Sequence, residues 1–315
     1  MADGNAITAD AIPVAAQQRR TGALQRLARR RSTLAFLMTL PLLAIILGLV
    51  AYPFVYAIYL SMLNKRMTRF IGLENFTFLM TRETFWSVFW QSVIFAVGAV
   101  IAKALIGFIL AHVLHALPAK GQRKWRGLLL VPWVIPPAIS TLAWWWLFDP
   151  SYSAFNWLLN TVGVPPVAWL GEASWARFSV ILVNVWYGAP FFMIMYLAAL
   201  KSVPDQLYEA AAIDGASGWQ KLRYVTIPMM KNIIMITVLF SLIVTFANFD
   251  IVRILTNGGP QDKTHIFGTY AFQVGIQSGD IPLGSAVSLF MFPFLAVFAV
   301  FVLRDVTKRN KEMAG

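Results

Sequence analysis

Long uncharged apolar segments alternate with short polar ones along most of the chain. The apolar segments cover residues 32–64, 84–119 with Lys103 inside, 127–148, 178–200, 232–249 and 283–303. A transmembrane helix needs about 20 such residues to cross the hydrocarbon layer, so each segment can span once. Membrane β-barrels show a different pattern, with alternating segments of about 10 residues. The sequence therefore predicts an all-α polytopic membrane protein with six transmembrane helices.

Prolines divide two of these segments. The first contains Pro41 and Pro53, and the third contains Pro132, Pro136 and Pro137. Proline has no backbone N–H, and it kinks a helix that contains it. We therefore expect the first and third helices to be interrupted, and a bundle of kinked helices can enclose a cavity.

Composition places the chain in the membrane class. It has 315 residues, of which 58% are hydrophobic and 13% charged, and a soluble domain of this size could not bury so much apolar surface. The chain has no cysteine, which excludes disulfide bonds, thiolate metal sites and a cysteine nucleophile. A net charge of +12 would suggest nucleic-acid binding in a soluble protein. In a membrane protein the distribution of the charges matters more, and we expect no nucleic-acid partner.

Basic residues indicate the orientation of the chain. Most of the 26 lysines and arginines lie before the first apolar segment, between the second and third, between the fourth and fifth, and after the sixth. The positive-inside rule then puts both termini and the loop of residues 201–231 in the cytoplasm. We expect a basic cytoplasmic segment over residues 1–31, a lipid-contacting transmembrane domain over 32–305 and a cytoplasmic tail over 306–315. The basic segment either lies on the anionic membrane surface or only sets the topology.

A polar island rich in small residues, EAAAIDGASGWQKLRYVTIP, separates the fourth and fifth apolar segments. Ser202, followed by a proline and an acid, is typical of a helix start and predicts a short helix over 206–213. Gly215 should end this helix. Ser217 can cap a second one, which Pro228 should end. Taken alone, the pattern describes a water-exposed helical hairpin between two membrane helices.

Three stretches of the sequence resemble one family of membrane proteins. The Glu-Ala-Ala, Asp-Gly-Ala and Ile-Pro elements of the island stand at the spacing of the "EAA" loop of ABC importer permeases. The stretches NVWYGAPF, from Asn184, and LTNGGP, from Leu255, look like those of maltose-type carbohydrate permeases and favour the first of their two subunit types. The resemblance covers about residues 34–305. The chain departs from the family pattern at Leu222, Val225 and Asn232. These differences are conservative or lie at the edge of the loop.

The resemblance implies a type I ABC importer permease fold and a place in the bacterial cytoplasmic (inner) membrane. In that family the loop docks on ATPase subunits, and the implied coupling residues here are Glu209, Ala210, Ala211, Asp214 and Gly215. The implied partners are a second homologous permease, two ATPase subunits docking on residues 201–231, and an extracytoplasmic sugar-binding protein. The chain has no GxxxxGKS/T phosphate loop. We therefore expect no cofactor in this chain, with ATP and magnesium bound by the ATPase partners.

The same resemblance implies a sugar site on the fourth and fifth helices. Its expected substrate-binding residues stand three or four apart, on one face of each helix: Asn184, Tyr187, Gly188, Phe191, Ser241, Val244, Thr245 and Asn248. Amide and hydroxyl groups bond sugar hydroxyls, and aromatic rings stack on the C–H faces of sugars. From the spacing alone, the same polar groups could equally join the helices to one another.

Ionisable residues within or beside the apolar segments are further candidates. Lys103 lies near the middle of the second helix, where a charge is costly and often functional. Asp250 and Arg253 stand three apart near the outer end of the fifth helix, which favours an intrahelical ion pair. The sharper hypothesis is that Lys103 or Arg253 meets an anionic substrate, such as a phosphorylated or sulfonated sugar.

Three function classes compete for these residues. The leading hypothesis is a non-enzymatic subunit that forms part of the translocation pathway of an ATP-driven sugar importer. The sequence does not decide the substrate, and candidates range from polyols to acidic sugars. The alternative is an ion-coupled secondary transporter in which Lys103 and Asp250 move protons or ions. A membrane enzyme would need a nucleophile–base or metal constellation. His112 and His115 share a helix face without a third ligand, so we expect no metal site, and His265 is expected to be an ordinary loop residue.

Overall fold

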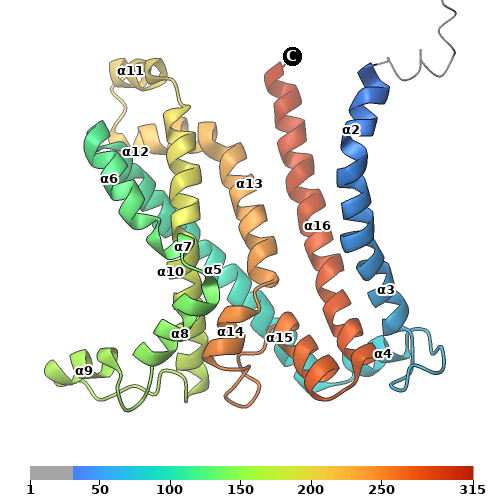
Figure 1. The fold of residues 1–315 in the computed structure, drawn as a ribbon. Helices are drawn as coiled ribbons and strands as arrows, with labels where there is room; N and C mark the ends of the chain where they lie inside the picture. The colour runs from blue at the N-terminus through green and yellow to red at the C-terminus, as the bar shows by residue number, and fades with distance from the viewer. Residues whose placement is uncertain (1–30, 315) are drawn as a thin grey trace, which may run out of the picture. The chain divides into compact units, whose positions relative to one another are not determined.

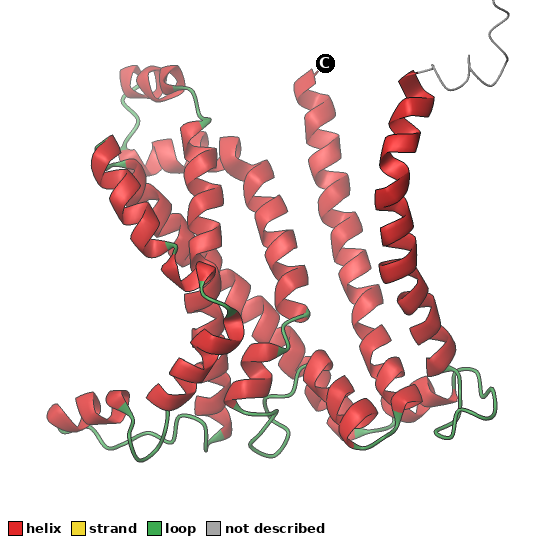
Figure 2. Ribbon diagram, in the orientation of Figure 1, coloured by secondary structure: helices red, strands yellow, loops and turns green. Residues whose placement is uncertain are grey.

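The computed structural model describes residues 31–314, so most of the predicted basic segment 1–31 lies outside the described residues. Within this range, every regular element longer than a single bridge is a helix (Figure 2). The chain separates into two compact units, residues 1–55 and 56–315. The all-α class predicted from the apolar segments is confirmed.

The first unit is formed by α2 (Arg31–Ile46), the π-helical turn η1 (Leu47–Ala51) and the beginning of α3 (Tyr52–Ser61). The backbone is helical without a break over Ala35–Ser61, although Pro41 lies inside α2. Pro53 has no N–H, and the Tyr52 N–H before it reaches five residues back to the Leu47 carbonyl. The π turn thus accommodates the proline, and the predicted interruption of this helix is wrong.

The second unit holds the remaining helices, in the order shown in Figure 1. They are α4 (Glu74–Met80), α5 (Glu83–His115), α6 (Ala119–Leu129), α7 (Val131–Val134), α8 (Pro137–Leu147), α9 (Ala154–Thr161), α10 (Ala173–Lys201), α11 (Asp205–Ile213), α12 (Gly218–Lys221), η2 (Leu222–Thr226), α13 (Ile227–Phe246), α14 (Asp250–Leu255), α15 (Phe267–Phe272), η3 (Gln273–Gln277) and α16 (Ile281–Ala314).

Five helices among the described residues are long and apolar enough to cross a membrane. They are Ala35–Ser61, Glu83–His115, Ala173–Lys201, Gly218–Phe246 and Ile281–Asp305. The third predicted apolar segment is instead divided among α6, α7 and α8. Pro132 opens α7, and Pro136 and Pro137 follow the extended Ile135. The predicted interruption of this helix is confirmed, and all six apolar segments fold as helix.

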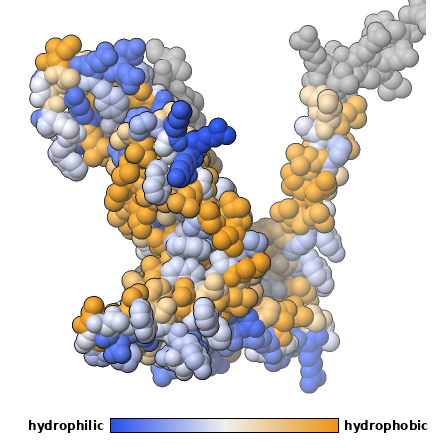
Figure 3. Space-filling model, turned by 60° about the vertical axis from the view of Figure 1, so that its left-hand side comes forward, coloured by the Kyte–Doolittle hydropathy of each residue, from blue (hydrophilic) through white to orange (hydrophobic). Residues whose placement is uncertain are grey.

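Large apolar side chains remain exposed along these helices. On α5, Leu105 and Ile109 are each 61% exposed. Figure 3 shows apolar side chains over much of the middle of one face, with polar ones nearer its ends. Such a surface is typical of contact with lipid hydrocarbon or with another membrane protein.

Helices α5 and α10 pack closely at the centre of the second unit. A methyl group added at Gly107 of α5 would lie 2.3 Å from Phe192 Cβ of α10, so the two backbones approach here as only glycine allows. The same region buries Ala111, Met193 and Tyr196. Because α13 contacts both helices, α5, α10 and α13 form the frame that positions the candidate site.

Candidate functional site

A cavity of about 60 Å³ lies among α5, α7, α10 and α13. Its lining contains every residue predicted to contact a sugar, together with Lys103: Lys103, Trp133, Asn184, Tyr187, Gly188, Phe191, Phe240, Ser241, Val244, Thr245 and Asn248. A buried water needs roughly 10–15 Å³ of such space, so this volume admits only a few water molecules. Residues from separate segments of the chain therefore meet on one mixed polar and aromatic surface.

Two aromatic residues of this lining belong to no motif of the sequence. Trp133 of α7 and Phe240 of α13 have ring centroids 5.8 Å and 5.3 Å from that of Phe191. Phe240 stands one helical turn before Val244, so helical periodicity would have placed it on the same face. Trp133 lies in a short helix between prolines, where no periodic signal exists.

Lys103 joins three helices inside the cavity. It is only 3% exposed, and its Nζ donates to Asn184 Oδ1 at 2.9 Å and to Thr245 Oγ1 at 2.7 Å. Thr245 Oγ1 in turn donates to the Ser241 carbonyl at 2.6 Å. The lysine stem passes over Gly188, where a Cβ would lie 2.5 Å from Lys103 Cδ. A glycine on α10 thus allows a lysine from α5 to reach α13.

Asn248 brings an unused acceptor to the cavity. Its Oδ1 is buried and has no hydrogen-bond partner. A buried carbonyl oxygen without a donor is costly, and it calls for water or a ligand hydroxyl. The cavity therefore combines one cationic donor, an open acceptor and aromatic faces, a set that suits a polyhydroxylated molecule.

Asp250 and Arg253 lie outside this cavity. Helix α13 ends at Phe246, and Asp250 begins the separate helix α14. The Arg253 guanidinium carbon lies 4.9 Å from the centre of the Phe272 ring, and no salt bridge joins it to Asp250 in the part of the chain that the structure describes. The predicted intrahelical ion pair is therefore wrong: both residues lie in α14, but the Arg253 guanidinium lies over the Phe272 ring.

The loop of residues 201–231 carries two short helices at one end of the second unit (Figure 1). Helix α11 ends at Ile213, and Gly215 adopts φ +74°, as the predicted stop requires. Ser217 forms a capping box with Gln220, which confirms the predicted cap of the second helix. Of the predicted coupling residues, Ala211 is half-buried and the others are exposed: Glu209, Ala210, Asp214 and Gly215.

Two details of this loop differ from the prediction. Ser202 does not cap α11; its Oγ donates back to the Ala199 carbonyl, and Pro204 stands at the N-cap. Pro228 does not end the second short helix, because α12, the π turn η2 and α13 continue as one helix over Gly218–Phe246. The proline falls in the first turn of α13, after a π turn that needs no donor from it.

Side-chain contacts hold this loop to the membrane helices. The Tyr208 hydroxyl of α11 lies 3.0 Å from Thr226 Oγ1 in η2. Lys201, at the end of α10, donates to Gln122 Oε1 of α6, whose Nε2 donates to the Leu114 carbonyl of α5. The loop is thus connected to α5, α6, α10 and α13, and a displacement of α11 would act directly on the frame of the cavity.

Comparison with known proteins identifies the chain. The family model described as "Binding-protein-dependent transport system inner membrane component" matches residues 103–307. The chain belongs to this family. The trehalose/maltose transport system permease protein of Thermococcus litoralis is 33% identical to this permease, over 89% of this chain and 95% of that protein. The sulfoquinovosyl glycerol transport system permease protein of Agrobacterium fabrum is 31% identical, over 88% of this chain and 91% of that protein.

The fold of the permease matches a solved ABC importer. A chain of a bacterial ABC transporter involved in the import of the acidic polysaccharide alginate has a TM-score of 0.78 and 23% identity, covering 90% of this chain and 98% of that one. This likeness shows the fold, that of a type I ABC importer permease. Together with the family, it makes the chain a non-catalytic membrane subunit and not an enzyme.

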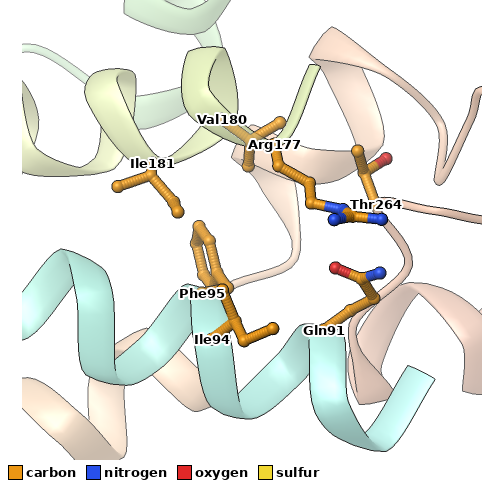
Figure 4. A pocket seen from close by; sticks show the side chains of 7 residues that line it. All are labelled: Gln91, Ile94, Phe95, Arg177, Val180, Ile181 and Thr264. Carbon is orange, nitrogen blue, oxygen red and sulfur yellow. The ribbon is translucent and has the colours of Figure 1, made fainter. Parts of the chain in front are cut away.

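A second, much smaller cavity of about 10 Å³ lies between α5, α10 and the segment after α14 of the permease (Figure 4). The Arg177 side chain extends between Gln91 and Thr264, and its Nε donates to the Lys263 carbonyl at 3.2 Å. Phe95 lines the apolar side of this cavity. The space holds at most one water molecule, so these contacts fasten the segment after α14 to the bundle and leave no room for a ligand.

His265 is the centre of that segment. It is 2% exposed, and Gly258, at φ +88°, leaves room for its ring where a Cβ would come within 2.1 Å. Its Nδ1 lies 3.0 Å from Thr269 Oγ1 and its Nε2 3.4 Å from Asp262 Oδ1. Burial lowers the pKa of His265, against the opposing effect of the Asp262 carboxylate. His265 lies in a loop, as predicted, but it is buried and the segment folds around its ring.

Proposed function

We propose that this permease forms half of the translocation pathway of an ATP-driven importer for a sugar or sugar derivative. One observation carries the proposal: the eight predicted sugar-site residues of α10 and α13 line a single cavity with Lys103. The names of the relatives, for trehalose/maltose and sulfoquinovosyl glycerol transport, support sugars as the substrate class. The family description supports dependence on an extracytoplasmic binding protein.

In this proposal the cavity is the empty form of the sugar site, open to the surface beside Trp133, Phe240 and Val244, which are 44%, 53% and 50% exposed. The hydroxyl of Ser241, the amide of Asn184 and the open acceptor of Asn248 bond sugar hydroxyls, while Phe191 and Tyr187 stack on sugar C–H faces. Because the enclosed part admits only a few waters, a sugar hydroxyl can reach the buried Asn184 and Thr245 only when the lining rearranges.

The 201–231 loop is the proposed docking surface for an ATPase subunit. Glu209 and Asp214 are exposed charges that can pair across an interface, and Ala210 lets the backbone of α11 approach a partner closely. Ile213, at the end of α11, is 87% exposed. The loop lies between α10 and α13, so closure of two ATPase subunits would move the helices that line the cavity. The second pathway half is a homologous permease, and ATP and magnesium are bound by the ATPase subunits.

The positive-inside rule supports a cytoplasmic position for this loop and both termini in the cytoplasmic membrane. A cysteine introduced at Trp219, which is 68% exposed, should then react with a thiol reagent only when the inner face is accessible. A cysteine at Tyr152, which is 77% exposed near the other end, should react in intact cells. The opposite labelling pattern would reverse the proposed orientation.

The substrate is either a neutral sugar or polyol, or a sugar with an anionic group. Of the two candidate cations, only Lys103 lines the cavity, so an anionic group would meet Lys103 and not Arg253. Replacement by methionine at each position separates these cases. Selective loss of uptake of a sulfonated or phosphorylated sugar in Lys103→Met would support an anionic substrate. Equal effects on the uptake of charged and neutral sugars would exclude the anionic-substrate hypothesis.

The function is tested with the importer reconstituted in vesicles and a panel of labelled sugars. Thr245→Val removes a hydroxyl from the cavity, and Thr237→Val removes one with the same 2.6 Å bond to the carbonyl four residues earlier on α13 but outside the cavity. We expect ATP-dependent uptake to fall about tenfold only in Thr245→Val, as loss of one well-placed contact implies. Equal uptake by both variants would contradict the site. Loss of uptake when ion gradients are collapsed under high ATP would favour a secondary transporter.

A further inference from the structure

Lys103 forms its hydrogen bonds inside the proposed sugar site without a charged partner. Its ammonium is buried among neutral partners, and no acidic residue lines the cavity around it. A charge at this depth is costly unless its hydrogen bonds are made. Asn184 Oδ1 and Thr245 Oγ1 supply those bonds, at 2.9 Å and 2.7 Å.

These two acceptors are also groups that a sugar would need. Thr245 Oγ1 donates its one proton to the Ser241 carbonyl and accepts from Lys103, so it has no proton left for a sugar hydroxyl and one of its two acceptor positions is taken. Asn184 Oδ1 receives the same ammonium. In the empty cavity, therefore, the lysine takes bonds that sugar hydroxyls would make, at Asn184 and Thr245, which are only 4% and 1% exposed.

The same bonds fix the relative position of three helices. Lys103 extends from α5, Asn184 from α10 and Thr245 from α13. The lysine stem is confined by Gly188, since a Cβ there would lie 2.5 Å from Cδ. Breaking the bonds removes the side-chain bridge from α5 to both α10 and α13 at the depth of the cavity, so these helices become free to separate there.

We propose that Lys103 is a positioning residue that holds the buried polar end of the empty site together. It bonds Asn184 and Thr245 until the hydroxyl groups of the substrate replace it, and its release lets α10 and α13 move apart. This inference rests on the proposed function, since it takes the cavity to be the sugar site. It holds for neutral and anionic substrates alike, because either must displace the lysine from the same two acceptors.

The test measures opening of the empty cavity in the assembled importer, without sugar or binding protein. The chain has no cysteine, so Ser241→Cys provides a single thiol in this chain, at a cavity-lining position that is 5% exposed. Its reaction with a small water-soluble methanethiosulfonate is followed by the mass of this subunit. Lys103→Met in this background should raise the labelling rate at least fivefold. Lys103→Gln, which keeps an amide donor, should restore slow labelling in large part.

A second variant displaces the lysine without removing it. Gly188→Ala places a methyl group against Lys103 Cδ and should also accelerate labelling. Gly98→Ala is the matched control, because its added Cβ would lie at an ordinary 3.8 Å from Ile181 Cδ1 between the same two helices, α5 and α10. It should label as slowly as the parent protein.

The outcomes separate this inference from the proposed function. Unchanged labelling in both Lys103→Met and Gly188→Ala would overturn the positioning role, and so would equally fast labelling in Lys103→Gln and Lys103→Met. If Lys103→Met does not assemble, Gly188→Ala decides. Failure of the parent importer to take up any sugar with ATP would instead count against the proposed function, whatever the labelling rates are.

Discussion

The 201–231 loop and the cavity are two polar regions of a largely apolar permease, and they differ in how far their polar groups are exposed and paired. In the loop, Glu209 and Asp214 have no ion-pair partner within the described residues, and Ile213 is 87% exposed. In the cavity, Lys103 is 3% exposed and bonded to Asn184 and Thr245. A surface with open polar and apolar groups suits docking by another protein, while a bonded interior suits a site whose polar groups pair with one another when it is empty.

The two regions share their supporting elements. Helices α10 and α13 line the cavity, and they also carry the two ends of the loop. Tyr208 and Lys201 connect the loop to α13 and, through Gln122, to α6. A rigid helix transmits displacement along its length, so movement at the loop and opening of the cavity are expected to be one event.

The largest effect is expected where the loop changes direction. Gly215→Asp puts a side chain at φ +74°, a conformation that glycine adopts most readily, and adds a charge beside Asp214. We expect ATP-driven uptake to fall at least about 100-fold, as loss of docking implies, while insertion into the membrane is unchanged. Uptake and membrane content of the protein are measured together.

Gly163→Asp is the matched control for that variant. Gly163 has φ +76° and open space around it, as Gly215 does, but it follows α9 far along the chain from the loop. It should retain most of the uptake. Equal loss in both variants would show that backbone strain alone, and not the position in the loop, explains the effect.

The next effect concerns the frame of the cavity. Gly107→Ala would bring its Cβ to 2.3 Å from Phe192 Cβ and 2.9 Å from the Met193 nitrogen, and overpacking of this kind costs about 1–3 kcal/mol. The melting temperature of the purified importer should fall by several degrees. Gly98→Ala should leave it within about a degree of the parent, since its Cβ makes an ordinary contact. Equal melting temperatures would contradict the close packing of α5 on α10.

A smaller effect should come from the tie between α11 and η2. Tyr208→Phe removes the hydroxyl that lies 3.0 Å from Thr226 Oγ1, a bond worth about 1 kcal/mol. Looser docking of α11 should lower the sugar-stimulated ATPase rate of the importer a few-fold. Tyr224→Phe, at a position 70% exposed on the same loop, serves as the control and should have the parent rate. A stronger effect in the control would assign the docking contact to Tyr224.

The smallest effect is a pH dependence from outside both regions. Burial lowers the pKa of His265, so the unfolded state binds a proton more readily than the folded state once the pH falls below about 6.5. The permease should therefore lose stability between pH 7.5 and 5.5, and His265→Gln should show a smaller drop in melting temperature. Replacement of the exposed His115 should leave the drop unchanged. Identical drops in all three proteins would show that His265 does not titrate in this range.

Helical periodicity explains why the cavity lining was predictable. Asn184, Tyr187 and Phe191 stand on one face of α10, as Ser241, Val244 and Thr245 do on α13, because both helices are regular there, while Asn248 follows the end of α13. The partners of Lys103 were not predictable, since its bonds reach across 81 and 142 residues of sequence. Local patterns carry no information about which helices pack together.

The wrong predictions have local causes. The fifth membrane helix ends at Phe246, and Asp250 and Arg253 share the short helix α14, where Arg253 lies over the Phe272 ring and not beside Asp250. Ser202 has the spacing of a cap, yet it lies in the last turn of the preceding helix and bonds backward. Pro53 was expected to interrupt a helix and Pro228 to end one, and a π turn before each proline keeps the helix continuous instead.

The central claim, that the 201–231 loop docks on an ATPase subunit, is tested most directly by photo-crosslinking. A benzophenone attached at Ala210→Cys, on the exposed face of α11, should crosslink to the ATPase subunit in the assembled importer. The same probe at Tyr152→Cys, 77% exposed in the segment before α9, should not. Crosslinking from Tyr152, or its absence from Ala210 in an importer that hydrolyses ATP and takes up sugar, would contradict the account.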